Sequence, residues 1–210
     1  MIADRTVREL LEDIASSSPA PGGGSVAALS GALGTALTGM VCRLTIGKKK
    51  YAQSEAAMKK TLAQADSLRS TFVALSDRDT RAFEKVMEAY GLPKDSDPHK
   101  ALRDAAIREA TKEAALVPLE VMRHCIDALA LAKDAASLGN PRVVSDAGVG
   151  AIMLHAACRS AALNVAVNLN ALDDQDFVGW KRGELQSLES TSAAMLEEIN
   201  GIVAGRLAAP

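Results

Sequence analysis

The 210-residue chain is poor in aromatic side chains, which make up only 3% of its residues. It also lacks an excess of basic charge, since 24 lysines and arginines are balanced by 26 aspartates and glutamates. Proteins that bind nucleic acids usually combine a positive surface with aromatic platforms on which bases stack. The composition therefore argues against a nucleic-acid partner.

Cysteine is equally scarce and shows no ligand spacing. Cys42, Cys125 and Cys158 lie far apart in apolar segments, and their odd number fits neither a disulfide framework nor a zinc site. The N-terminus carries Asp4 and Arg5 where a secretory signal peptide needs an apolar core. We therefore expect buried reduced thiols, no metal and a cytoplasmic location.

No stretch of the chain alternates apolar and polar residues over the length of a strand. Apolar residues recur instead at helical spacing, interrupted by turn residues such as Gly91-Leu92-Pro93 and Gly139-Asn140-Pro141. We predict an all-α fold in which residues 1–210 form one domain, an elongated up-and-down helical bundle with an N-terminal helical arm. The predicted helices are 7–14 after the cap Thr6, 26–46, 54–90, 99–138 with a kink or short break at Pro118, 145–171, and from Asp173 or Asp174 onward.

Two nearly uncharged runs are too short or too interrupted to cross a membrane. A span needs about 20 predominantly apolar residues, whereas the run from Val26 to Cys42 is shorter and rich in small residues. The second run, from Ala147 to Leu172, contains His155, Arg159 and three asparagines. Both runs predict central helices of a soluble bundle, in which small residues allow other helices to pack closely.

The segment Pro19-Ala20-Pro21-Gly22-Gly23-Gly24-Ser25 stands out among the turns. Its prolines fix an extended entry to the next helix, and its glycines allow a close approach to the backbone. We expect Ser25 to be the N-cap of that helix, whose free N–H groups attract anions or carbonyl oxygens. A cap alone needs one glycine at most, so three glycines predict that something binds against the backbone here.

Several polar side chains allow both a structural and a functional interpretation. Asn164 and Asn168 lie one helical turn apart, and they either join helices through hydrogen bonds or face a ligand. Asp146 either caps its helix or reacts, and Asp79 lies mid-helix, where a solvated face is the default. Lys48–Lys50 either compensate the carbonyl end of a helix or bind an anion. No catalytic triad, phosphate loop or dinucleotide fingerprint is present.

Seven short motifs follow one another at defined spacings between Val7 and about Phe177. They are Pro19-x-Pro-Gly-Gly-Gly-Ser25, Met40-Val41 with Thr45-x-Gly-Lys-Lys49, Asp79-x-x-Ala-Phe83, Gly91-Leu-Pro-Lys94, Val117-Pro118, Gly139-Asn140 with Ser145-Asp146, and Asn164 with Asn168. Each motif is weak alone. In this order and spacing, they resemble the cyclodeaminase/cyclohydrolase family of folate enzymes, and within it the bacterial cyclohydrolase branch.

The resemblance implies an all-helical homodimer that binds folate near its subunit interface and needs no metal or redox cofactor. It also implies reversible hydrolysis of 5,10-methenyltetrahydrofolate to 10-formyltetrahydrofolate, in which water attacks the methenyl carbon. One carboxylate can take a proton from water and then protonate N5 of the folate. We predict Asp146 for this role, with Asp79 as the second choice and Lys48 as a neighbour that stabilises the carboxylate.

The resemblance further implies contacts between the folate and a set of residues drawn from the same motifs. The predicted substrate-binding residues are Pro21, Gly22, Gly23, Gly24, Ser25, Lys49, Lys94, Asn140, Ser145, Asn164 and Asn168. The lysines would meet the glutamates of a folate tail, including a polyglutamylated one. Two other functions stay open: a formiminotetrahydrofolate cyclodeaminase that releases ammonia, and a folate-binding helical module without turnover.

Overall fold

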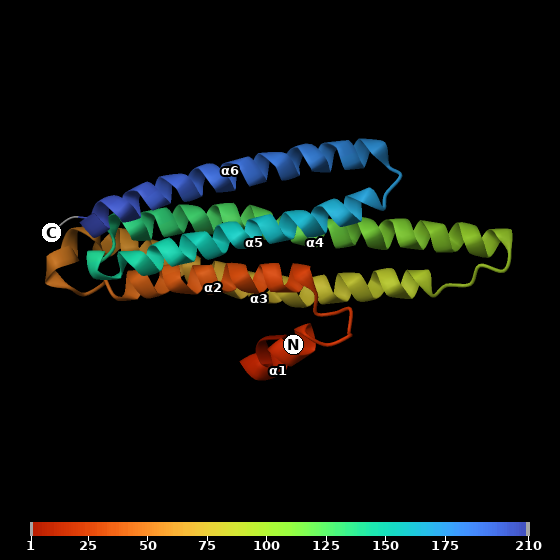
Figure 1. The fold of residues 1–210 in the computed structure, drawn as a ribbon, viewed down its shortest axis with the longest axis horizontal. Coiled ribbons are helices and arrows are strands. Elements are labelled where there is room, and N and C mark those ends of the chain that lie inside the picture. The colour runs from red at the N-terminus through yellow and green to blue at the C-terminus, as the bar shows by residue number, and fades with distance from the viewer. Residues whose placement is uncertain (1, 209–210) are drawn as a thin grey trace.

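A computed structural model of the chain describes residues 2–208 and contains, within that range, six α-helices and no strand (Figure 1). The helices are α1 (Val7–Ile14), α2 (Gly23–Arg43), α3 (Glu55–Tyr90), α4 (Asp97–Leu138), α5 (Val144–Asn170) and α6 (Gln175–Ala208). Short 3-10 segments cover Ile2–Asp4, Lys49–Ser54 and Pro141–Val143. The prediction of an all-α, elongated bundle is confirmed.

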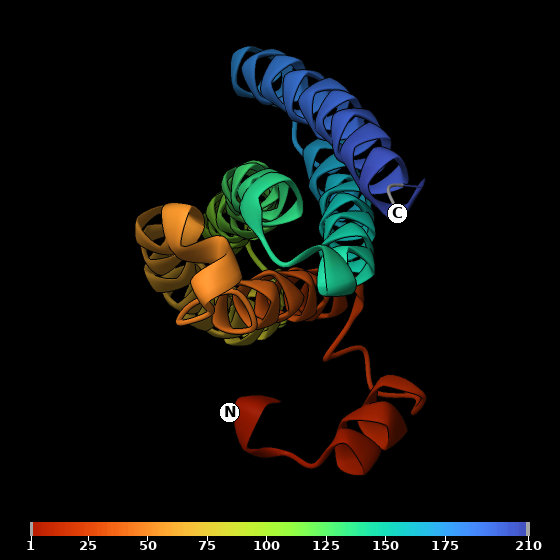
Figure 2. The ribbon, with the colours of Figure 1, turned by 90° about the vertical axis from the view of Figure 1, so that its left-hand side faces the viewer.

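The five long helices α2 to α6 run side by side along one axis, and α1 stands apart near the N-terminal end of α2 (Figures 1 and 2). Viewed end-on, α2 lies between α3 and α5 (Figure 2). The hairpin of α3 and α4 extends past the ends of the other helices (Figure 1). The N-terminus of α2 therefore lies alongside the α3–α4 hairpin, short of the connection between these two helices.

Small residues set the close spacing of the central helices. Gly31 of α2 faces the ring of Phe72 in α3, where a Cβ on the glycine would lie 2.6 Å from a ring carbon. Gly34 and Gly150 bring α2 and α5 together, because a Cβ on Gly34 would lie 2.7 Å from the carbonyl oxygen of Gly150. The small-residue run of α2 therefore packs closely against two helices, as the sequence predicts.

Contrary to the expectation that both runs are too short or too interrupted, α2 and the segment 141–170 are long and apolar enough, by length and composition alone, to cross a membrane. In the bundle, 61% of the most apolar window of α2 is buried against other helices. Core helices of soluble proteins have the same composition, so both segments agree with the predicted central helices. Cys42, Cys125 and Cys158 are buried free thiols, also as predicted.

Helix α4 runs without a break through Pro118, where we predict a kink or a short break. Proline has no N–H, so the carbonyl oxygen of Ala114, four residues earlier, lacks its helical donor. The side-chain amide of Asn168 in α5 donates a hydrogen bond to this oxygen at 3.0 Å. A neighbouring helix supplies the hydrogen bond that proline cannot make, and the predicted break is wrong.

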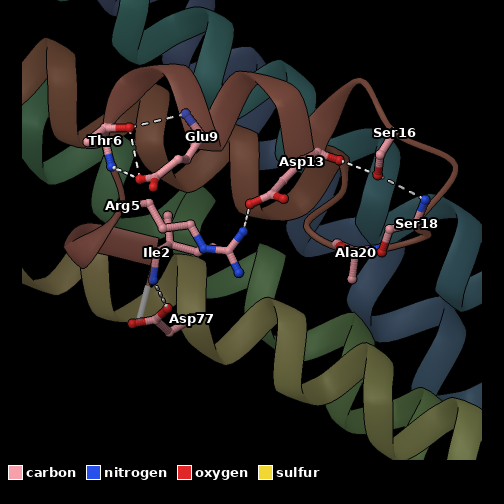
Figure 3. Close-up of polar contacts among 9 residues, drawn as sticks. All are labelled: Ile2, Arg5, Thr6, Glu9, Asp13, Ser16, Ser18, Ala20 and Asp77. Carbon is pink, nitrogen blue, oxygen red and sulfur yellow. Dashed lines mark hydrogen bonds and ion pairs between the residues drawn. The ribbon is translucent and has the colours of Figure 1, made fainter.

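Contacts within the N-terminal arm and one contact to α3 are visible in Figure 3. Thr6 caps α1 and forms a capping box with Glu9, which confirms the predicted helix start. Ile2 is buried, and its main-chain N–H donates to Asp77 Oδ1 of α3 at 2.8 Å. The arm is thus anchored on α3, beside the entry to α2.

Candidate active site

Apart from Lys94, which lies in the connection between α3 and α4, the predicted site residues fall into two groups at opposite ends of α2. The first group surrounds the N-terminus of α2, and the second lies near its C-terminus and the start of α5. Helix α2 has 21 residues, so at a rise of about 1.5 Å per residue roughly 30 Å separate the two groups. One protomer therefore does not bring all the predicted residues into one pocket.

A cavity of about 360 Å³ lies at the N-terminus of α2. Its lining includes six of the predicted site residues, namely Gly22, Gly23, Gly24, Asp79, Asn164 and Asn168. The remaining lining is mostly apolar and includes Phe83 of α3 and Val167 of α5. Pro21 lines a neighbouring groove along the arm, and Ser25 is fully buried in the first turn of α2. This group is the candidate active site.

The carboxylate of Asp79 lies on the first turn of α2. Ser25 Oγ donates a hydrogen bond to Asp79 Oδ2 at 2.9 Å, and the main-chain N–H of Ser25 bonds the same carboxylate. A Cβ on Gly24 would lie 2.1 Å from Asp79 Oδ1, so glycine is needed to leave room for the carboxylate. What approaches the glycine backbone here is a side chain of α3.

This arrangement corrects the predicted helix start. Helix α2 begins at Gly23, and its N-cap is Gly22, which makes no side-chain hydrogen bond. Ser25 is therefore not the N-cap. Of the first-turn groups, the main-chain N–H and the hydroxyl of Ser25 both bond the Asp79 carboxylate from another helix, 54 positions away in the sequence. Asp79 is favourably placed for this, because helix N-termini attract negative charge.

Burial raises the pKa of the Asp79 carboxyl above its ordinary value, and the hydrogen bonds from Ser25 partly offset this effect. Within residues 2–208, no basic side chain forms an ion pair with Asp79. Asp79 is half-buried, and a partly desolvated carboxylate without a counterion attracts a cationic ligand and accepts a proton more readily than an exposed one. Asp79 is thus the group in the cavity best suited to move a proton.

Both asparagines, Asn164 and Asn168, line the cavity, and Asn168 also joins two helices, as the structural interpretation predicts. Asn164 Nδ2 donates to the carbonyl of Ser160 at 2.9 Å, and Asn168 Nδ2 donates to the carbonyls of Ala114 and Asn164 at 3.0 and 2.9 Å. Neither Oδ1 atom has a hydrogen-bond partner among the residues that the structure describes. Both side chains can therefore accept N–H groups of a ligand, while the amide nitrogen of Asn164 is held within α5 and that of Asn168 joins α5 to α4.

In the second group, Asn140 ties the end of α2 to the start of α5. Its main-chain N–H donates to Thr45 Oγ1 at 2.8 Å, and its Nδ2 donates to the carbonyl of Leu44 at 3.3 Å. Its Oδ1 accepts from the Tyr51 hydroxyl at 2.9 Å. The side chain of Asn140 is thus fully engaged in holding this end of the bundle together.

Asp146 lies half-buried in the first turn of α5 and has, within the described part of the chain, no hydrogen bond or ion pair. Lys48, Lys49 and Ser145 are exposed at the same end of the bundle. Lys94 is exposed in the connection between α3 and α4. None of these residues lines the Asp79 cavity. Within residues 2–208, no group of three or more His, Cys, Asp or Glu side chains is placed to hold a metal ion.

Sequence reasoning missed Thr80 and Phe83, which line the cavity next to Asp79. The signal was present in the spacing, because residues three and four positions apart share one side of a helix, and Phe83 lies three residues after Thr80 and four after Asp79. Thr80 Oγ1 lies 3.1 Å from Ser25 Oγ, and Phe83 follows Asp79 by one turn. The polar side of α3 that we took for a solvated face is therefore the wall of the cavity.

Comparisons with known proteins agree with one another. The sequence profile of the family described as formiminotransferase-cyclodeaminase matches residues 6–187. A methenyltetrahydrofolate cyclohydrolase from Methylorubrum extorquens is 47% identical over 95% of this chain and 96% of its own length. A formimidoyltransferase-cyclodeaminase from Sus scrofa is 32% identical over 91% of this chain, which spans 36% of that relative. The crystal structure of formiminotetrahydrofolate cyclodeaminase from Thermotoga maritima superposes with a TM-score of 0.89 at 29% identity, covering 99% of this chain and 100% of the other.

Proposed function

We propose that this chain, which belongs to the formiminotransferase-cyclodeaminase family, is a methenyltetrahydrofolate cyclohydrolase. The observation that carries the assignment is the 47% identity to the Methylorubrum extorquens cyclohydrolase over 95% of the chain. The reaction hydrolyses 5,10-methenyltetrahydrofolate to 10-formyltetrahydrofolate in one-carbon metabolism, and it is reversible. It requires neither a metal nor a redox cofactor.

Asp79 replaces Asp146 as our first choice for the proton carrier. The substrate is a cation, and the half-buried Asp79 carboxylate lines the cavity without a counterion in the described part of the chain. A fixed negative charge at this point stabilises the cationic methenyl group. The carboxylate takes a proton from the water whose oxygen bonds to the methenyl carbon. It then gives this proton to N5 as the bond between N5 and that carbon breaks, and the remaining hydroxyl proton leaves to solvent.

In this proposal, Asn164 and Asn168 bind the pterin ring. Their Oδ1 atoms accept N–H groups, which the pterin ring presents along its edge, and their own Nδ2 atoms are fixed by main-chain carbonyls. Phe83 and Val167 supply apolar walls for the ring system. The glycine turn places the whole ligand next to Asp79.

We further propose a cytoplasmic location, because the relatives are named as enzymes of folate metabolism, and a homodimer, because exposed apolar side chains lie along α2 and α5. Leu33, Val149, Ile152, Leu163 and Val167 lie on these two helices and are 49–73% exposed. A two-fold axis through these side chains would set α2 of one copy antiparallel to α2 of its partner. The partner's Lys48 and Asp146 would then approach the Asp79 cavity, and its lysines would meet the glutamates of the folate tail, polyglutamylated or not.

The cyclohydrolase assignment is tested by the methenyl absorbance of the substrate. Purified protein should accelerate its loss well above the rate in the same buffer without protein. A rate equal to the uncatalysed rate at every protein concentration would contradict the assignment.

A formiminotetrahydrofolate cyclodeaminase is the second candidate, because the Thermotoga maritima neighbour with that title shares the fold over the full chain. Both activities involve the methenyl compound, so one cavity can serve either. The two substrates should be compared side by side. Release of ammonia from 5-formiminotetrahydrofolate at a kcat/KM above that for methenyl hydrolysis would make the deaminase the main activity.

The shared site is tested by mixing two inactive variants. In a heterodimer of Asp79→Asn and Asp146→Asn, a site built across the interface would keep both native carboxylates in one of its two copies. Co-expression should therefore restore activity that neither variant has alone. If activity is not restored although heterodimers form, the partner's Asp146 does not contribute to the Asp79 site.

A further inference from the structure

We propose that Ser25 is the positioning residue of the reaction, because its hydroxyl holds the Asp79 carboxyl in both of its protonation states. The proposal rests on the proposed function, in which Asp79 moves a proton. It assigns to Ser25 a role other than the predicted helix cap or ligand contact. The role follows from three contacts that the Ser25 hydroxyl makes on α3.

The three contacts are of different chemical kinds. Ser25 Oγ lies 2.9 Å from Asp79 Oδ2, 3.1 Å from Thr80 Oγ1 and 3.1 Å from the main-chain carbonyl oxygen of Ser76. A hydroxyl has one hydrogen to donate and two lone pairs, and it rotates to suit its neighbours. Ser25 can therefore donate to one oxygen while it accepts from another.

When Asp79 is ionised, the Ser25 hydroxyl donates to Oδ2 and accepts from the Thr80 hydroxyl. When Asp79 carries a proton on Oδ2, that proton is donated to Ser25 Oγ, and the Ser25 hydroxyl turns to the carbonyl of Ser76. In both protonation states, Ser25 Oγ and Asp79 Oδ2 therefore remain hydrogen-bonded to each other. A group that could only donate, such as a lysine, would suit the ionised state alone.

Gly24 complements this arrangement from the other side of the carboxylate. A Cβ at Gly24 would lie 2.1, 2.6 and 2.7 Å from Oδ1, Cγ and Oδ2 of Asp79. The carboxylate therefore has one position, with Oδ2 against Ser25 and Oδ1 against the glycine. Both Asp79 and Gly24 line the cavity, so this position also faces the substrate.

Ser76→Ala is a matched control for Ser25→Ala. Ser76 is as fully buried as Ser25, and its Oγ donates to the Ser25 carbonyl at 3.2 Å across the same helix pair. Its side chain makes no hydrogen bond to Asp79 in the described structure, and its main-chain carbonyl stays in the variant. The two variants thus lose similar packing, and only one of them loses the contact with the carboxyl.

The test is the pH dependence of kcat/KM for the initial approach to equilibrium, corrected for the uncatalysed rate in each buffer. Loss of the Ser25 donor disfavours the ionised form of Asp79, so the acid limb of Ser25→Ala should move up by roughly one pH unit. At pH values below that limb, kcat/KM of Ser25→Ala should be about tenfold lower than that of the wild type at the same pH. Ser76→Ala should keep the wild-type limb. An unmoved limb in Ser25→Ala, or equal shifts in both variants, would overturn the proposal.

A second measurement separates this proposal from the proposed function. The carboxyl carbon of Asp79 can be followed by NMR titration in the ligand-free protein, with its signal assigned by Asp79→Asn. The titration midpoint should rise in Ser25→Ala and not in Ser76→Ala, whether or not the protein hydrolyses the folate. If the midpoint rises but no hydrolysis is found, the proposed function fails and the contact stands. If it does not rise, the positioning role fails.

Discussion

Asn168 should stabilise the protein largely by supplying the hydrogen bond to the Ala114 carbonyl that Pro118 cannot donate. A double-mutant cycle measures this contribution. Asn168→Ala removes both hydrogen bonds donated by Nδ2 and leaves the Ala114 carbonyl without a helical donor. A lost hydrogen bond costs about 0.5–1.5 kcal/mol net, and an unsatisfied buried group about 1–3 kcal/mol. Because Asn168 borders the cavity, water can reach part of the gap. We therefore expect a loss of about 1–2 kcal/mol, or a fall in Tm of roughly 2–8 °C.

The cost of Asn168→Ala should depend on the residue at 118. Pro118→Ala restores a main-chain N–H that can donate to the Ala114 carbonyl, so the same Asn168 substitution should then cost about 1 kcal/mol less. Urea unfolding of the two single variants, the double variant and the wild type gives this coupling energy. Asn164→Ala is the control, because Asn164 Nδ2 donates only within its own helix. Equal costs of Asn168→Ala in both backgrounds would refute the reasoning.

Two further substitutions and one pH effect follow from the packing. Gly34→Ala should destabilise the protein by more than about 2 kcal/mol, since the new Cβ would meet the Gly150 backbone. Gly179 has open space around it, so Gly179→Ala should stabilise the protein by up to about 1 kcal/mol. Thermal unfolding checks both, and a mild Gly34→Ala would contradict the close helix crossing. Burial and the nearby Arg159 lower the pKa of His155 below its ordinary 6.5. Protonation then favours the unfolded state, so stability should fall as the pH drops below about 6.5, and His155→Gln should flatten that fall in urea titrations.

The helices could be predicted from the sequence because their limits are local. Gly91-Leu92-Pro93 ends α3 within a residue of the prediction, and Gly139 closes α4 as expected. The start of α2 could not be predicted, since Ser25 bonds Asp79, 54 residues later, through its hydroxyl and main-chain N–H instead of capping the helix. The continuity of α4 at Pro118 likewise depends on Asn168, 50 residues away. Local rules cannot identify such partners.

The sequence predicts residues of the candidate site but not how they are arranged in space. The glycine turn, Asp79 and the two asparagines do share one cavity. Asp146 was ranked above Asp79 because it stands in the first turn of a nearly uncharged helix, whereas Asp79 lies in a charged stretch of α3. Whether a charged residue of a helix is shielded from solvent depends on its neighbours in space. For Asp79 that neighbour is Gly24, which leaves room for the carboxylate.

The measurement that tests the central claim most directly is the turnover of Asp79→Asn beside Asp77→Asn. Asp77 lies two residues away on α3 and does not line the cavity. Asparagine keeps the shape of the side chain but cannot carry the proton, so kcat should fall about 10²–10⁴-fold. The Tm near pH 7 should not fall, because burial disfavours the native ionised carboxyl. Asp77→Asn should keep nearly full turnover. An Asp79→Asn protein with kcat within threefold of the wild type would contradict the account.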